Sequence, residues 1–327
     1  MPFSSFSDLD DHALSLVSSG WAPRTRAGYG SAIKRFLSFT AAYGLSPLPL
    51  NEELLLRYVA HLNLQQLAPS TIKNYLSALR AWVIANGFDE PIIWTPRVHL
   101  ACRAVSRSHD PPRQVLPITY DILSSMFNHL TPSTDHLLVA AALSLQYFAC
   151  LRASELCSNS ALAITPARSD VSFYQSGSSF IMLYKCHVSK TSPHGFEVHV
   201  GCSGAPICAP CIMHRFLLSC PSEPSSPLFR FTSGHLLSYS LYNSIIKRLV
   251  QLAGLDSSNY SSHSVRAGAA TQAARAGLDP DSIKRLGRWR SQAYLAYLRP
   301  PPEAYASLAP PLAAHIHTNS THPVARP

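Results

Sequence analysis

His263-Ser-Val-Arg266-Ala-Gly-Ala-Ala-Thr271, with the later stretch Leu286-Gly-Arg-Trp-Arg-Ser-Gln-Ala-Tyr-Leu-Ala-Tyr-Leu-Arg299, decides how the chain is interpreted. His263 and Arg266 are three residues apart, so they share one face of a helix. Ser261 or Ser262 is the expected N-cap of that helix. The small residues after Arg266 allow the helix to pack closely. An imidazole and a guanidinium are therefore brought close together.

Two further short helices follow in the sequence. Gly277 is the expected end of the first helix. A second helix is predicted over 279–287, with an aspartate as N-cap and a proline as its first residue. A third helix, ended by the prolines at 300–302, carries Tyr294 and Tyr297. Three short helices thus gather an imidazole, a guanidinium, an indole and a phenol.

This combination resembles the C-terminal signature of the tyrosine recombinase (phage integrase) superfamily. The signature consists of the His-x-x-Arg pair, a Leu-Gly pair followed by a bulky ring residue, and a tyrosine ten residues after that glycine. The sequences Gly-Arg-Trp and Ala-Tyr-Leu-Ala-Tyr-Leu-Arg are most similar to those of recombinases from eukaryotic mobile elements of the DIRS and Crypton type. The resemblance covers roughly residues 20–308. It implies a nuclear DNA recombinase, or a cytoplasmic one if the source is not eukaryotic.

Length and composition bound the fold. The 327 residues suffice for two domains, and 46% hydrophobic residues support real cores. The net charge of +9 suits a nucleic-acid binder and also many enzymes. The first residues lack the basic and apolar regions of a signal peptide. The longest apolar run, 137–151, is shorter than the roughly 20 residues that span a bilayer, so no membrane partner is expected. The eight cysteines are interpreted as reduced thiols.

The first hundred residues are predicted to be helical throughout. The segments 22–34 and 68–80 echo each other, because each begins Ala-Pro-x-Thr and keeps apolar residues at helical spacing. A further amphipathic helix is predicted over 51–64, with an asparagine as its cap. No strand pattern occurs here. We therefore predict an N-terminal extension over 1–19 and an all-helical core-binding domain over 20–105.

The two Ala-Pro-x-Thr helix starts are candidate phosphate-binding sites. Free N–H groups and the positive end of a helix dipole favour an anion there, although an ordinary solvated helical face explains the same residues. The resemblance favours the phosphate site, because the core-binding domain of phage-type integrases clamps one side of the DNA duplex. The candidate DNA-binding residues are Arg24, Thr25, Arg26, Lys34, Arg35, Thr71, Lys73 and Asn74.

A polar, proline-rich segment over 106–117 is predicted to be the linker to a second domain. Two helices, one of them buried, and several strand-like segments indicate a mixed catalytic domain over 118–308. The strands are expected at 171–174, 179–188 and 196–200. The tail, 309–327, has no core-building pattern and is expected to be disordered. The predicted fold class is mainly α with a small antiparallel β-sheet.

Arg152 and Lys190 complete the catalytic set that the resemblance implies. Arg152 opens an Arg-x-x-Glu-Leu sequence, where the family has its first catalytic arginine. From the residues alone, a buried ion pair with Glu155 explains it as well. Lys190 lies in a turn between two predicted strands, where the family has the acid that protonates the leaving group. A lysine in a hairpin turn is usually only solvated, and Lys185 is the fallback for this role.

A cysteine-rich segment raises the question of a metal site. Cys208-Ala-Pro-Cys211 is a Cys-x-x-Cys pair, with Cys202 before it and His214 after it. A second such pair, or a His-x-x-x-His pair at zinc-finger spacing, is missing from the sequence. A zinc-dependent interaction module would rest on this one pair. From the sequence we therefore expect no metal and no cofactor.

Metal-free cleavage of a phosphodiester requires a nucleophile, positive charge on the non-bridging oxygens and a proton donor for the leaving 5′ oxygen. The resemblance assigns the nucleophile to Tyr297, which would form a 3′-phosphotyrosine; Tyr294 is one helical turn from the expected position. The other implied roles are phosphate binding by Arg152 and Arg266, protonation of the leaving group by Lys190, and proton transfer at the tyrosine by His263.

The position after Gly287 departs from the family pattern. The family has His or Trp there, whereas this chain has Arg288 followed by Trp289, so either Arg288 donates to the phosphate or Trp289 fills the place. Two functions follow: an active site-specific recombinase of a mobile element, or an inactive DNA-binding protein derived from one. The complete set of candidate catalytic residues favours the recombinase. The expected partners are double-stranded DNA and further copies of the chain, as a dimer to tetramer on DNA.

Overall fold

The computed structural model describes residues 6–89, 93–110, 115–158, 165–187, 192, 194–296 and 298. The chain divides into two compact units, Met1–Pro112 and Arg113–Pro327. The predicted tail at 309–327 lies outside the described residues, as do Lys190 and Tyr297.

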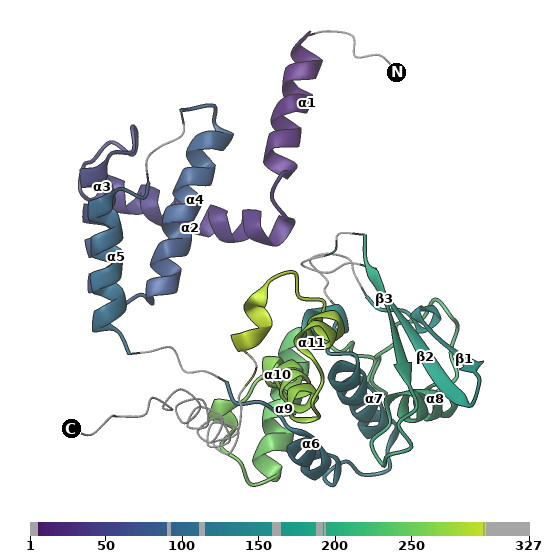
Figure 1. Cartoon of the computed structure of the whole chain (residues 1–327). Coiled ribbons are helices and arrows are strands. Elements are labelled where there is room, and N and C mark those ends of the chain that lie inside the picture. Colours follow the sequence, from purple (N-terminus) through teal and green to yellow (C-terminus); the bar gives the residue numbers. More distant parts are fainter. Residues whose placement is uncertain are drawn as a thin grey trace, which may run out of the picture. The chain divides into compact units, whose positions relative to one another are not determined.

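The first unit is built from helices, and its described residues contain no strand. The helices are α1 (Phe6–Ser19), α2 (Pro23–Ala42), α3 (Glu52–Leu64), α4 (Pro69–Ala85) and α5 (Pro96–Ser108) (Figure 1). Helices α2 to α5 enclose one apolar core, in which Phe36, Tyr58, Leu62 and Leu79 are fully buried. The amphipathic helices predicted from the sequence therefore meet along their apolar faces.

Two of these helices begin in the same way. Ala22 and Ala68 are the N-caps of α2 and α4, neither makes a side-chain capping bond, and a proline follows each. Helix α3 instead uses Asn51, whose side-chain oxygen accepts from the Leu54 N–H at 2.9 Å. Because proline has no N–H, the starts of α2 and α4 carry one unpaired donor fewer than the start of α3, which has no proline.

Helix α5 continues into the segment 106–117 that the sequence predicted to be a linker. It ends at Ser108, and Val105 in its last turn is buried in the core of the first unit. The hydroxyl groups of Ser106 and Ser108 donate to backbone carbonyls of the preceding turn, at 2.8 and 3.1 Å. The first three residues of the predicted linker, 106–108, are therefore helical.

The second unit combines helices with one small sheet (Figure 1). Its α-helices are α6 (Tyr120–Phe127), α7 (Thr134–Phe148), α8 (Ala209–Ser219), α9 (Tyr239–Leu252), α10 (Ser262–Arg275) and α11 (Pro280–Gly287). Among its short 3-10 turns are η1 (Ala153–Glu155) and η5 (Gln292–Ala296). The predicted fold class, mainly α with a small antiparallel sheet, is confirmed.

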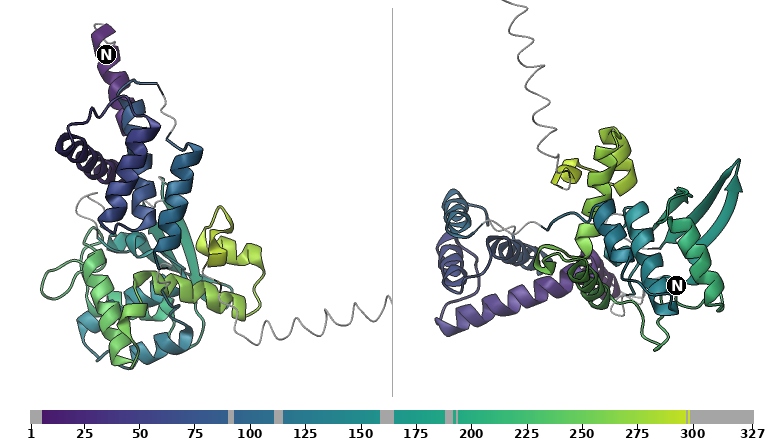
Figure 2. Two further views of the ribbon diagram at one scale, coloured as in Figure 1. Left: turned by 90° about the vertical axis from the view of Figure 1, so that its left-hand side faces the viewer. Right: turned by 90° about the horizontal axis from the view of Figure 1, so that it is seen from below.

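The sheet has the strand order β1 (Val171–Ser176), β2 (Ser179–Cys186), β3 (Phe196–Gly201), and both pairs are antiparallel. Met182, Tyr184 and Cys186 are buried and alternate along β2 with neighbours that are more accessible to solvent. This alternation gives the sheet one core-facing side. Figure 2 shows α8 beside the sheet, where it contacts β2 and β3.

Helix α7 is the central helix of this unit, and every residue from Leu138 to Tyr147 is buried. None of the helices in the described part of the chain combines the length and apolarity needed to cross a bilayer.

Helix α10 approaches the backbone at Ile118 so closely that a Cβ on Gly268 would lie 1.7 Å from the Ile118 carbonyl oxygen. A glycine is therefore required at this crossing, which sets the position of α10.

Candidate active site

Helix α10 carries the His-x-x-Arg pair. Ser261 is its N-cap: the hydroxyl accepts from the His263 N–H at 3.2 Å, and the Ser261 N–H donates to the Ser264 hydroxyl at 3.0 Å. Ser262, the alternative cap, lies inside the helix. This start directs Arg266 to the buried side of α10, where the residue is 1% exposed.

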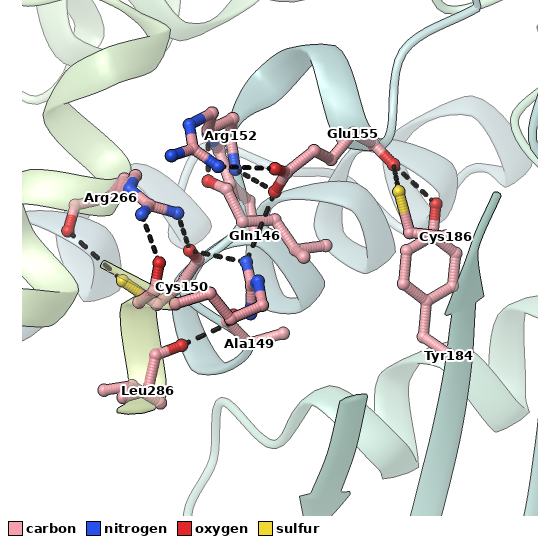
Figure 3. Close-up of polar contacts among 12 residues, drawn as sticks. Gln146, Ala149, Cys150, Arg152, Glu155, Tyr184, Cys186, Arg266 and Leu286 are labelled. Atoms are coloured by element: carbon pink, nitrogen blue, oxygen red, sulfur yellow. Dashed lines mark hydrogen bonds and ion pairs between the residues drawn. The ribbon is translucent and has the colours of Figure 1, made fainter. Parts of the chain in front are cut away.

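Arg266 connects the end of α7 with the end of α11 (Figure 3). Its Nη1 donates to the Cys150 carbonyl and its Nη2 to the Gly287 carbonyl. Cys150 has a φ of 47°, which is uncommon for a residue other than glycine. Burial is the main reason why the pKa of Arg266 lies below its ordinary value. One buried guanidinium on α10 thus binds the Cys150 carbonyl, 116 residues earlier in the chain, and the Gly287 carbonyl, 21 residues later.

Arg152 is held by Glu155, whose side chain is completely buried. The Arg152 N–H donates to Glu155 Oε2, and Nη1 donates to Oε1, both at 2.8 Å. The ion pair expected from the residues alone is therefore present. Arg152 is also close enough to Arg266 for its charge to lower the pKa of Arg266, and Figure 3 shows the two arginines near Cys150. Arg152 therefore forms the ion pair with Glu155 and also lies near Arg266, so the two interpretations of this arginine do not exclude each other.

Arg288 points into the protein. It follows α11 in the left-handed conformation, with a φ of 55°. Its guanidinium donates to the carbonyls of Ala149 and Cys150, at 3.1 and 3.2 Å, and to Glu155 Oε2 at 3.3 Å. Its Cζ lies 4.2 Å from the centroid of the Phe196 ring on β3. Glu155 is therefore a shared counter-ion for two arginines.

Trp289 packs directly on Arg266. The Arg266 Cζ lies 4.4 Å from the centroid of the indole ring, which is a cation–π geometry. The ring also lies against Gly287, where a Cβ would come within 1.8 Å of its Cζ3 atom. Trp289, the second residue after Gly287, therefore contacts Arg266 with its ring. Arg288, the first, binds backbone carbonyls.

Tyr294 is a packing residue in this structure. It is 6% exposed and forms a small cluster with Ala273 and Ile283, and its ring centroid lies 6.1 Å from that of Trp289. The place of Tyr297 lies outside the described residues.

His263 lies on the exposed side of the first turn of α10. Partial burial, and then the positive charges of Arg266 and Arg152, lower the pKa of its imidazole below the ordinary 6.5. A neutral imidazole near neutral pH can accept a proton. Its electrostatic coupling to both arginines places His263 in the same cluster as the guanidinium groups.

Lys185, the fallback for the leaving-group acid, faces the wrong side of the sheet. Its Nζ lies 3.4 Å from Glu197 Oε1, across β2 and β3, and both side chains are about half exposed. Its neighbour Tyr184 points the other way and donates to the Glu155 carbonyl at 2.7 Å. Because side chains alternate along a strand, Lys185 points away from Glu155 and the arginines. Lys190 lies outside the described residues.

Gln146 is a positioning residue that its sequence pattern does not predict. Its Nε2 donates to the carbonyls of Ser262 and Leu151, at 3.0 and 3.2 Å, and its Oε1 accepts from the Tyr242 hydroxyl at 2.7 Å. It therefore ties the start of α10 to the turn that carries Arg152. The only sign of this positioning role in the sequence is that a single glutamine interrupts the apolar run of α7.

The DNA-binding candidates lie on α2 and α4 of the first unit. The N–H groups of Thr25 and Thr71 donate to the Ala22 and Ala68 carbonyls, at 2.8 and 2.9 Å, so these two amides are not free donors as the sequence suggested. Arg35 donates to the side-chain oxygen of Gln65. The exposed candidates are Arg26, Lys34, Arg35, Lys73 and Asn74. The side chain of Arg24 lies outside the description.

Solved structures with a similar architecture come from DNA recombinases. A post-cleavage complex of the XerH site-specific recombinase with a palindromic difH substrate has a TM-score of 0.59 at 14% identity, covering 85% of this chain and 76% of that chain. A lambda integrase dimer bound to a COC′ core site gives 0.57 at 17% identity, covering 90% and 77%. The Tn1549 transposon integrase in complex with circular intermediate DNA gives 0.56 at 14%, covering 90% and 98%. At these identities the similarity concerns the fold.

Sequence comparison locates the family relationship in the second unit. No curated protein matches the chain. The sequence profile of the Phage integrase family matches residues 118–298, which is more than half of the chain and includes the arginine cluster around Cys150. With this match and the shared fold, the chain belongs to the phage integrase family.

Proposed function

We propose that the chain is a site-specific DNA recombinase that cuts and rejoins DNA through a 3′-phosphotyrosine intermediate. The observation that carries this proposal is the Cys150 carbonyl, which accepts from both Arg266 and Arg288, with Arg152 two residues further along the chain. Guanidinium groups repel one another, so a cluster of them is most useful where an anion binds. The scissile phosphate of DNA is such an anion.

Arg152 and Arg266 are assigned to the phosphate. A guanidinium carries five N–H donors in a planar fork, more than any other side chain offers to an anion. Two forked guanidinium groups match the non-bridging oxygens of a phosphate. Trp289 covers one face of Arg266 and excludes water from it, which strengthens its electrostatic interactions. Arg288, bound to carbonyls, positions the cluster, and Trp289 takes the place after Gly287.

Tyr297 is assigned the nucleophile, since Tyr294 is buried in packing. Its oxygen forms a bond to phosphorus while the bond from phosphorus to the 5′ oxygen breaks. His263 accepts the phenolic proton, and Lys190 donates a proton to the leaving 5′ oxygen. Attack by a 5′ hydroxyl of another strand reverses the step and rejoins DNA, so the exchange needs no external energy source.

The proposal extends to partners and origin. Double-stranded DNA is the substrate, more than one copy of the chain acts on it, and exposed basic residues on α2 and α4 contribute contacts to the backbone. The resemblance to DIRS-type and Crypton recombinases adds a mobile element and a nuclear location. In support, proteins of similar fold include a transposon integrase in complex with DNA and an integrase dimer on its core site.

The test uses the purified full chain and nicked duplexes made from the ends of the genetic element that surrounds its gene. In such a suicide substrate the leaving strand diffuses away, so a covalent adduct accumulates on a denaturing gel. We expect the wild-type chain to form the adduct. Arg266→Lys should lower its rate by about 100-fold, while Arg230→Lys, on a loop of the same unit, should not. DNA binding without any adduct would identify the alternative, an inactive DNA-binding protein.

A further inference from the structure

Three cysteines meet where the sheet joins α8. The Cys202 Sγ lies 3.4 Å from the Sγ atoms of both Cys208 and Cys211, and all three sulfur atoms lie within 4.8 Å of one another. All three are free thiols. Within the described part of the chain, they are the group of ligand side chains that could hold a metal ion.

The fold fixes each of the three positions separately. Cys202 directly follows β3, and its N–H donates to the Phe180 carbonyl of β2 at 2.8 Å. Gly204 then turns the chain with a φ of 68°. Cys208 is the buried N-cap of α8, and Cys211 lies in the first turn of that helix. A strand end and a helix start therefore hold the sulfur atoms, without a disulfide to bring them together.

The separations agree with the geometry of a zinc–thiolate site. A zinc–sulfur bond of about 2.3 Å places two sulfur ligands of a tetrahedron roughly 3.8 Å apart. The observed separations, from 3.4 Å to no more than 4.8 Å, bracket that value. A disulfide needs about 2.05 Å and could join only two of the three thiols. A cation that binds thiolates uses all three.

His214 supplies a candidate for the fourth ligand. It lies three residues after Cys211 on α8, so the two share a helix face, and it is exposed. Its ring centroid is 5.7 Å from that of Phe180, whose carbonyl accepts from the Cys202 N–H. His214 and Cys202 thus adjoin the same residue. A change of side-chain rotamer is required for its imidazole to enter the cluster.

We propose that Cys202, Cys208, Cys211 and His214 bind one structural zinc ion. The ion would join the end of β3 to the start of α8 and so fasten the sheet to the helical part of this unit. From the sequence we expected no metal here. The spacing of the cysteines along the chain does not show that Cys202 lies beside the Cys-x-x-Cys pair in the fold. The site is separate from the arginine cluster, and the proposal does not depend on strand transfer.

The first experiment measures the metal in the intact chain. The protein is purified in reductant through a tag without histidine, dialysed and analysed for zinc. We expect about one zinc ion per chain. After removal with a chelator, Co²⁺ should restore binding and produce the sulfur-to-cobalt charge-transfer absorption of a thiolate site. Zinc below about a tenth of an ion per chain, with no cobalt–thiolate absorption in the reduced protein, would overturn the proposal.

Variants then assign the ligands. Cys208→Ser and Cys211→Ser should each lose the zinc and melt several degrees lower. Cys220→Ser is the matched control, because Cys220 is the C-cap of the same helix and lies outside the cluster; it should keep the ion. His214→Ala should weaken zinc binding by about 10- to 100-fold, and unchanged affinity would remove His214 from the site. Cobalt titration of the wild-type chain decides the main question even if a cysteine variant fails to fold.

Discussion

The guanidinium carbon of Arg266 lies 4.4 Å from the centroid of the Trp289 ring, with Arg266 almost completely buried. The same indole ring lies against Gly287, whose carbonyl accepts from Arg266 Nη2. Arginine, indole and glycine therefore form one packed unit at the end of α11. This arrangement explains how the chain can place arginine directly after Gly287 and still keep a ring next to the second arginine of the site.

Trp289→Ala should impair both stability and strand cleavage. Loss of the half-buried ring should reduce the free energy of unfolding by about 3 kcal/mol. Removal of the cation–π contact and entry of water should slow adduct formation with nicked DNA by about 10- to 100-fold. Trp289→Phe keeps a ring over Arg266 and should be affected less. Wild-type unfolding and cleavage in the alanine variant would show that this packing is irrelevant.

Glu155→Gln should destabilise the second unit. The carboxylate is completely buried and pairs with Arg152 and Arg288, so its neutralisation removes the negative charge that faces both guanidinium groups. Removing the charge of one partner in a buried ion pair lowers the free energy of unfolding by about 3 kcal/mol or more. Chemical denaturation of the second unit measures the change. The control is Glu197→Gln, which breaks an exposed pair with Lys185 and should cost less than about 0.5 kcal/mol. Equal effects would mean that Glu155 is not the shared counter-ion.

The His263 imidazole should titrate below pH 6.5, because partial burial and the charges of Arg266 and Arg152 lower its pKa. As the pH falls below 6.5, the unfolded chain takes up this proton before the folded chain does. The free energy of unfolding should therefore decrease until the pH passes the folded pKa, and His263→Gln should remove that part of the decrease. NMR titration of the imidazole measures the pKa directly. Arg152→Gln should raise it, whereas a wild-type value above 6.5 contradicts the described site.

Gly268→Ala tests the close crossing of α10 over Ile118. A Cβ at Gly268 would lie 1.7 Å from the Ile118 carbonyl oxygen. The backbone fixes the positions of both atoms, so neither can rotate away from the other. We expect a loss of about 3 kcal/mol in unfolding free energy. Gly201→Ala is the control in the same unit, since a Cβ there meets nothing within 4 Å; it should change stability by less than about 0.5 kcal/mol. Similar melting temperatures for both variants would contradict this crossing.

Local signals predicted the elements that hold the site. Asn51 caps α3, Asp279 caps α11, and Gly277 ends α10 with a φ of 79°, all as their residue types indicate. Such caps depend on a few neighbouring residues, so the sequence contains the required information. The burial of α7 followed from its continuous apolar run. The order of strands and helices then gave the fold class.

The contacts that organise the cluster depend on chain segments far apart, and the sequence could not supply them. The direction of Arg288 depends on carbonyls at the end of α7, and the role of Gln146 depends on the start of α10. Spacing likewise did not show that Cys202 lies beside Cys208. Arg152 could be placed near Arg266 only through the family resemblance, because the residues alone explained it as a partner of Glu155.

The central claim is that Tyr297 attacks DNA, and mapping the covalent adduct tests it most directly. The full chain is reacted with the nicked duplex, digested with protease, and the DNA-linked peptide is identified by mass spectrometry. We predict a link at Tyr297, loss of the adduct in Tyr297→Phe with nearly unchanged DNA affinity, and an intact adduct in Tyr294→Phe. A link at Tyr294, or an adduct that survives Tyr297→Phe, would contradict the account.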